Sequence, residues 1–250
     1  MSNKIAVVLG SNIHWAPYFY KYESIFSKKN INFDLILWNR EGLNENTIGN
    51  IISYNKKDKS CDHNFFKVFK FFAFARFTKK VIKNNKYEKI VFLGLHGCAP
   101  VLNVRYFSNN YKQKFWLDIR DYHYEWFKPY YNLEKKLINN SYKTVISSTG
   151  FKKFLPSFNY GVVHNIDSNI ETIFKNFKKI PSEKIRISFI GNVRYYEENV
   201  KLLNLLKNDD RFVLQYFGAN SNHLMDYCTK NNILNVEFYG RFPYEKTIDF

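Results

Sequence analysis

The residues best suited to chemistry follow one apolar run, Ile185 to Ile190. That run leads into a Gly191-Asn192 turn, then Arg194, then apolar residues at helical spacing from Val200 to Leu206. A strand that feeds a glycine turn and a helix N-terminus suits a phosphate, because backbone N–H groups and the helix dipole face the anion. A guanidinium at the same point can pair with a diphosphate. The alternative is that Arg194 is a solvated surface side chain.

Polar or glycine residues also follow the other predicted strands. In open parallel sheets ligands bind at the carboxyl ends of the strands, so these residues are the next candidates. They are Ser11, His14, His96, Asp118, Arg120 and Asp121 in the first part of the chain, and Gly218 and Arg241 in the second. A single glycine in such a place is most often only a turn, so each position alone is weak evidence.

Two histidines and one aspartate in this set could take part in catalysis. His96 follows an apolar strand and has glycines nearby, so it could act as a base or hydrogen-bond donor at a cleft, or be a partly exposed loop residue. His14 leaves the same two alternatives. Asp121, with Asp118 and Arg120, could offer a carboxylate to a sugar hydroxyl. The alternative for Asp121 is a helix cap or a local ion pair.

Apolar runs and helical patterns alternate along the chain. The predicted strands are 5–9, 33–38, 89–94, 115–119, 144–147, 160–164, 185–190, 212–217 and 236–239. The predicted helices are 18–29, 65–83, 101–111, 133–140, a short one from Phe151, 200–206, 224–230 and the first turns of another in 243–250. The strands are apolar throughout rather than alternating, which is typical of a parallel sheet covered on both faces. The sequence therefore predicts an α/β protein.

A polar, basic stretch divides this alternation. We predict an N-terminal Rossmann-like domain over residues 1–167, a linker over 168–184 and a second Rossmann-like domain over 185–250. The second domain has three predicted strands and would be marginal as an independent unit.

Composition limits the partners and the compartment. The 250-residue chain has a formal net charge of +16, which favours nucleic acid, anionic lipid or a phosphorylated substrate without choosing among them. A basic nucleic-acid-binding protein ranks lower, because no RRM, KH or helix-turn-helix motif is visible. The three cysteines lack metal-like spacing, so we expect no metal site. With no signal-peptide pattern and no long apolar run, we expect a cytoplasmic protein.

Residues 65–80, FFKVFKFFAFARFTKK, combine seven phenylalanines with lysine and arginine. A basic, phenylalanine-rich amphipathic helix can lie on an anionic membrane surface, here the inner face of the membrane. The alternative is a core-packed helix whose lysines extend to solvent.

In order and spacing, five segments resemble GT-B glycosyltransferases, in particular the family-four-like group that uses nucleotide sugars. The segments are FWLDIRDY from Phe115, VISSTGF from Val145, VVHNID from Val162, ISFIGNVRYYEENVKLL from Ile187 and VEFYGRFPYEKTIDF from Val236. They extend from residue 115 to residue 250. The resemblance implies two Rossmann-like domains, the first for an acceptor and the second for a nucleotide-sugar donor.

The resemblance also assigns roles to the candidate residues. The donor would contact Gly191, Asn192, Arg194, Gly218 and Arg241. His96 and Asp121 would be catalytic, and the acceptor side would hold Ser11, His14, Asp118 and Arg120. It implies no metal and no cofactor, because the helix dipole and basic residues would stabilise the leaving diphosphate.

The chain departs from the family pattern at two places. Glu197 and Glu198 stand where the family often has a lysine, and a later donor-binding segment with two glutamates is absent. We therefore expect a second domain truncated at its C-terminus. The expected function is sugar transfer to a saccharide or lipid-linked acceptor, in surface polysaccharide synthesis. A non-catalytic glycosyltransferase fragment is the alternative.

Overall fold

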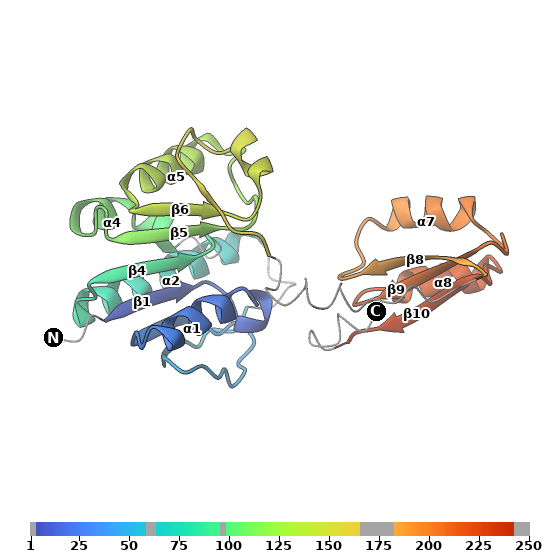
Figure 1. Ribbon diagram of the computed structural model, residues 1–250, viewed down its shortest axis with the longest axis horizontal. Helices are drawn as coiled ribbons and strands as arrows, with labels where there is room; N and C mark the ends of the chain where they lie inside the picture. The colour runs from blue at the N-terminus through green and yellow to red at the C-terminus, as the bar shows by residue number, and fades with distance from the viewer. Residues whose placement is uncertain (1–3, 59–63, 96–98, 166–182, 243–250) are drawn as a thin grey trace. The chain divides into compact units, whose positions relative to one another are not determined.

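The computed structural model describes residues 4–58, 64–95, 99–165 and 183–242. The chain divides into two compact units, residues 1–168 and 169–250. Each unit contains a parallel β-sheet with helices packed on it (Figure 1). The prediction of an α/β protein with two parallel sheets is therefore confirmed. Residues 168–182 of the predicted linker and the helix expected over 243–250 lie outside the described residues.

Unit 1 is built on a seven-stranded sheet in which every neighbouring pair is parallel. Its strands are β1 (Ile5–Leu9), β2 (Phe33–Trp38), β3 (Asn50–Tyr54), β4 (Lys89–Leu93), β5 (Phe115–Ile119), β6 (Lys143–Ile146) and β7 (Gly161–Val162). They lie in the order β3-β2-β1-β4-β5-β6-β7. The order reverses between β1 and β4, and such a switch point is where open α/β sheets bind ligands.

The helices of unit 1 cover both faces of its sheet, as a doubly wound fold requires (Figure 1). They are η1 (Ile13–Trp15), α1 (Phe19–Lys28), α2 (Asn64–Asn85), α3 (Ala99–Leu102), α4 (Val104–Asn110), α5 (Lys128–Asn140) and η2 (Thr149–Lys153). Helix α1 buries Phe19 and Phe26 on one face. Helices α2 to α5 pack on the other face.

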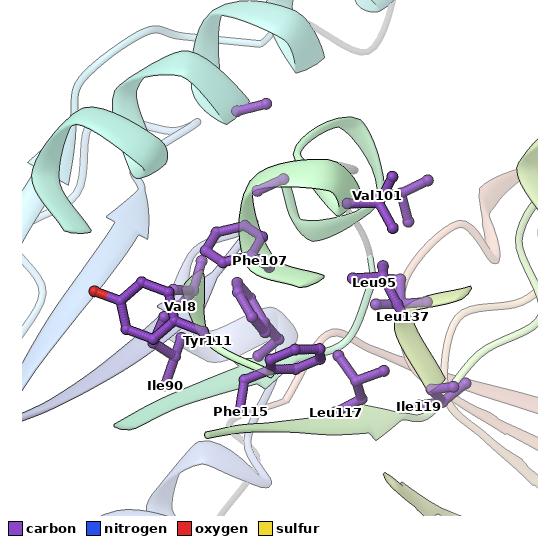
Figure 2. Close-up of a cluster of buried hydrophobic side chains, with 14 of the residues drawn as sticks. Val8, Ile90, Leu95, Val101, Phe107, Tyr111, Phe115, Leu117, Ile119 and Leu137 are labelled. Carbon is purple, nitrogen blue, oxygen red and sulfur yellow. The ribbon is translucent and has the colours of Figure 1, made fainter. Parts of the chain in front are cut away.

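The larger core of unit 1 lies between its sheet and α2 to α5 (Figure 2). Aromatic rings fill much of it: Phe92 lies 4.9 Å from Phe107 and 6.0 Å from Phe115, measured between ring centroids. Phe74 of α2 stacks on Trp38 at 5.3 Å. The alternation of side chains along each strand sends β1, β2 and β4 residues to both cores, which explains why these strands are apolar throughout.

Unit 2 has a three-stranded parallel sheet in the order β10-β9-β8. Its elements are β8 (Ile185–Ile190), α7 (Tyr196–Leu205), β9 (Phe212–Phe217), α8 (Asn222–Lys230) and β10 (Val236–Gly240). Both helices contribute to one core with the sheet, centred on Leu203, Leu214 and Leu224. This arrangement brings the ends of β8, β9 and β10 to one edge.

Three elements of unit 1 differ from the sequence-based prediction. Strand β3 was not predicted, because its sequence NIISY is short and mixed and it forms the edge of the sheet. The helix expected over 101–111 is interrupted at Asn103, whose side chain donates to the carbonyls of Ala75 and Ala99 at 2.8 and 2.9 Å. Helix α5 begins at Lys128, before the predicted start, since Pro129 favours the first turn of a helix.

Candidate functional site

The carboxyl edge of the unit 1 sheet is organised by Asn12, the third residue after β1. Its side chain is fully buried. Its amide nitrogen donates to Asn39 Oδ1 at 2.8 Å and to Glu45 Oε1 at 2.6 Å. Its amide oxygen accepts from the backbone of Arg40 and Glu41 at 3.0 and 3.1 Å. Asn12 therefore fixes the loop after β1 against the loop after β2.

This fixed loop presents His14 and Trp15 to solvent. His14 Nε2 lies 3.4 Å from Glu41 Oε1, and Trp15 Nε1 donates to the same oxygen at 2.6 Å. The two rings lie 4.9 Å apart. Ser11, the neighbouring candidate, is half-buried, and its hydroxyl donates to the Asn12 carbonyl at 3.2 Å. A histidine held by a carboxylate at a ligand edge can move a proton or donate a hydrogen bond.

Asp118 and Arg120 form a buried ion pair where β5 ends. Arg120 Nε lies 2.5 Å from Asp118 Oδ1, and Arg120 Nη2 donates to Oδ2 at 2.7 Å. The Tyr22 hydroxyl of α1 also donates to Oδ2, at 2.6 Å. Burial raises the pKa of Asp118, and the guanidinium opposes that shift. Because a guanidinium keeps its proton at ordinary pH, we treat the pair as ionic.

Arg120 links this pair to the end of β7. Its Nη1 donates to the Val163 carbonyl and to Asn165 Oδ1, both at 2.6 Å, and its guanidinium lies 4.9 Å from the centre of the Tyr18 ring. Burial and the charge of Asp118 raise the pKa of Tyr18 above its ordinary value, so its hydroxyl stays protonated. Through these contacts Arg120 links the ends of β5 and β7 to the start of α1.

The two predicted catalytic residues have different outcomes. Asp121 follows the ion pair directly and is exposed at the same edge. His96 lies outside the described residues, although β4 itself ends at this edge, where the Gly94 N–H donates to the Asp118 carbonyl at 2.7 Å. Five of the predicted residues of unit 1 therefore lie on one edge of the sheet, because each follows the carboxyl end of a parallel strand. They are Ser11, His14, Asp118, Arg120 and Asp121. Their roles toward an acceptor stay predictions.

In unit 2, two glycines control the edge where β8 and β9 end. Gly191 and Gly218 both have positive φ, at 135° and 141°. The Gly218 Cα lies so close to the Gly191 carbonyl that a Cβ there would stand 1.7 Å from the oxygen. The Gly191 N–H donates to the Phe217 carbonyl at 2.8 Å. Gly218 is therefore required for the two strand ends to meet.

The residues after these glycines form a second contact and then start α7. Asn220 Nδ2 donates to Asn192 Oδ1 at 2.7 Å, and the Val193 N–H donates to the Ala219 carbonyl at 2.9 Å. Arg194 is exposed beside this contact. The loops after β8 and β9 are therefore joined at the point where Arg194 meets solvent.

Helix α7 begins without a side-chain cap. Tyr195, at the N-cap, is left-handed with φ 57° and makes no capping hydrogen bond. Uncapped N–H groups at a helix start can bind an anion. Glu197 and Glu198 lie in the same first turn and compete with an anion for its positive potential. Arg241 is exposed after β10, whose last residue accepts from the Gly218 N–H at 2.7 Å.

Sequence reasoning found the strand ends but missed Glu45, Glu41 and Asn39, which hold the loops of unit 1. No local signal marks them, because their partners lie about 30 positions away in the chain. Within 4–58, 64–95, 99–165 and 183–242, no group of three or more histidine, cysteine or acidic side chains could hold a metal ion. Nor does any helix in those ranges have the length and apolar character to cross a bilayer.

Comparisons with known proteins place this geometry in a known fold. No protein-family model matches the chain, and no curated protein matches it. Among solved structures, sucrose-phosphate synthase from Thermosynechococcus elongatus aligns with a TM-score of 0.68 at 8% identity, covering 99% of this chain and 73% of that one. UDP-N-acetylglucosamine 2-epimerase from Rickettsia bellii aligns at 0.59 and 11% identity, covering 98% and 70%.

A third solved structure, Arabidopsis thaliana UGT89C1 complexed with UDP-L-rhamnose, aligns at 0.54 and 9% identity, covering 98% of this chain and 71% of that one. These alignments extend over both units. The chain therefore has the GT-B fold, as the sequence resemblance implied. At these identities the likeness defines the fold alone.

Proposed function

We propose that this protein is a glycosyltransferase that moves a sugar from a nucleotide-sugar donor to a saccharide or lipid-linked acceptor, in surface polysaccharide synthesis. Unit 2 binds the donor, and unit 1 binds the acceptor. No metal or other cofactor takes part. The protein acts in the cytoplasm, at the inner face of the membrane.

The edge of unit 2 that includes Gly191, Arg194 and the start of α7 carries this proposal. Gly191 and Gly218 keep side chains away from the strand ends, while Arg194 is exposed and α7 offers uncapped N–H groups. A guanidinium and a helix N-terminus both favour a diphosphate. Because charge grows on the diphosphate as the sugar leaves, these groups bind the transition state more tightly than the ground state. Asn192 and Arg241 complete the donor contacts.

Unit 1 supplies the groups that handle the acceptor. Asp121 and His14 are exposed at the carboxyl edge of its sheet, and His96 comes three residues after β4 in the sequence. Either of His96 and Asp121 accepts the proton of the attacking hydroxyl, since a general base must lie within hydrogen-bond reach of that proton. The buried Asp118–Arg120 pair and Ser11 hold the edge in shape.

A donor panel tests the proposal. The protein is incubated with uridine, guanosine and thymidine diphosphate sugars, with and without membrane extract as the acceptor, and nucleoside diphosphate release is measured. We expect release that depends on the acceptor for one donor. Release without acceptor indicates hydrolysis instead, and the absence of both binding and release for every donor contradicts the proposal.

A further inference from the structure

A second surface of unit 1 has no part in the candidate site. It is the later part of the turn between β5 and α5, residues 122–127, where large aromatic side chains face solvent. Trp126 is 72% exposed and Phe127 is 51% exposed, and their rings lie 6.0 Å apart. The Phe127 N–H donates to the Tyr124 carbonyl at 2.8 Å, so the turn is closed and directs both rings outward from a fixed backbone. We call Tyr122, Trp126, Phe127, Lys128, Lys152 and Lys153 the aromatic rim.

Near the rim most acidic side chains are buried, whereas the lysines are exposed. Two of the three acids of the turn and α5, Glu125 and Glu134, are buried. Glu125 Oε2 accepts from the backbone N–H of His123 at 2.6 Å. The lysines of the turn and helix are exposed; they are Lys128, Lys135 and Lys136. Apart from Asp121, which is exposed at the start of the turn, the exposed charged groups of the turn and α5 are therefore basic.

Helix η2 adds two more cations beside the turn. The Tyr122 ring lies 4.7 Å from the Phe154 ring, and Phe154 follows the exposed pair Lys152 and Lys153 directly. The rim therefore combines a tryptophan, a phenylalanine and a tyrosine with lysines from two elements. Tryptophan and tyrosine prefer the membrane–water interface, and clustered lysines attract anionic headgroups.

We propose that the aromatic rim docks unit 1 on an anionic lipid surface, with Trp126 and Phe127 inserted at headgroup depth. Exposed apolar rings surrounded by cations fit such a surface better than a neutral one. Since the rim follows β5, it adjoins the edge that holds Asp118 and Asp121. If the proposed function holds, docking would bring a lipid-linked acceptor to that edge.

The sequence pointed instead to residues 65–80, and α2 provides the comparison. In the part of α2 whose side chains are described, Phe74, Ala75, Thr78 and Ile82 are buried against the sheet. Phe69 and Phe72 remain 59% and 51% exposed. This helix therefore uses much of its apolar surface for the core. Its two exposed phenylalanines make a matched control for the rim.

Vesicle sedimentation tests the proposal with no donor present, so its result is independent of the proposed function. The probes are phosphatidylcholine vesicles with and without phosphatidylglycerol, an anionic lipid. We expect binding to the anionic vesicles only, reduced at least about fivefold by Trp126→Ala/Phe127→Ala and by Lys152→Glu/Lys153→Glu. Phe69→Ala/Phe72→Ala should leave binding unchanged.

Three outcomes would overturn the proposal. They are no binding to anionic vesicles, equal binding to both vesicle types, and loss of binding only in the α2 variant. All substituted side chains in the rim are exposed, so we expect each variant to fold. An unchanged far-ultraviolet circular dichroism spectrum checks this. The charge-reversal pair keeps both aromatic rings and therefore tests the electrostatic part separately.

Discussion

The carboxyl edges of the two sheets are built in opposite ways. In unit 1, buried polar side chains join the strand ends, through Asn12 and through the Asp118–Arg120 pair. In unit 2, the strand ends meet through backbone, with Gly218 directly against the Gly191 carbonyl. An edge tied by side chains can hold exposed groups such as His14 in place. An edge made of backbone leaves room for an anion to approach.

The largest expected effect lies in the side-chain edge of unit 1. Asp118→Ala removes one partner of a buried ion pair and leaves Arg120 uncompensated, which should destabilise unit 1 by about 3–5 kcal/mol. All four tryptophans lie in unit 1, so the tryptophan fluorescence change during urea unfolding reports on that unit. The control Asp121→Ala, at an exposed position, should cost under about 0.5 kcal/mol. Equal effects of the two substitutions would show that the edge does not depend on the pair.

The backbone edge of unit 2 offers a closely matched pair of substitutions. Gly191 and Gly218 have nearly the same φ, so alanine is strained at both, but only at Gly218 does the added Cβ meet another atom within 4 Å. We expect Gly218→Ala to destabilise unit 2 by roughly 3 kcal/mol more than Gly191→Ala, because a backbone carbonyl must move. Amide hydrogen exchange in β8 to β10 measures the difference. Similar protection in the two variants would contradict the close contact.

The buried acid beneath the aromatic rim should make unit 1 sensitive to pH. Burial, with a smaller effect of Glu125, raises the pKa of Glu134 from 4.5 to about 8. The native state then binds more protons than the unfolded state between these values, so this group lowers stability as the pH rises from about 4.5 to about 8. Above that range the loss is complete.

Glu134→Gln removes this titration. The variant should exceed the original protein in stability by a few kcal/mol at pH 8, with a much smaller gain at pH 5, since each pKa unit corresponds to about 1.4 kcal/mol. Urea unfolding followed by tryptophan fluorescence at the two pH values measures the gain. The exposed control Glu88→Gln should show no such dependence. A gain that is equal at both pH values would indicate a packing effect instead.

The smallest expected effect concerns the cation of unit 2. Arg194→Ala should weaken donor binding about tenfold, the loss of one charge-assisted hydrogen bond to the diphosphate. Isothermal titration of the nucleotide sugar measures it. Arg211→Ala is the control, because Arg211 is also exposed but lies before β9, paired with Asp209 at 2.7 Å. An equal loss of donor affinity in both variants would show that net positive charge, and not a specific contact of Arg194, causes the loss.

The sequence predicted those features of the fold whose cause lies within a few neighbouring residues, and it missed those that depend on contacts between distant residues. Strands β1 and β2 were predicted at their observed limits, because buried parallel strands are continuous apolar runs. The limits of β8 and β9 were also predicted, although β8 is an edge strand whose residues are exposed or half-buried. Strand β3 was missed because its sequence NIISY is short and mixed and carries no continuous apolar run. The interruption at Asn103 depends on the Ala75 carbonyl, which is 28 positions away.

The residues of the candidate site also divide into those with a local sequence signal and those without one. Gly191 and Arg194 were found because a strand, a turn and a helix follow one another in the sequence. The dependence of Gly218 on the Gly191 carbonyl could not be predicted, since it arises only when β8 and β9 lie side by side. The aromatic rim was also missed, because exposure of Trp126 and burial of Glu134 follow from how α5 packs.

The central claim is that a nucleotide sugar binds at the backbone edge of unit 2. Titration of the isotope-labelled protein, followed through its ten glycine amide resonances, tests it most directly. The account predicts that a nucleotide sugar shifts the resonances of Gly191 and Gly218 and leaves those of Gly42 and Gly150 in unit 1 unchanged. Shifts confined to unit 1, or no shift at saturating concentrations of every donor, would contradict it.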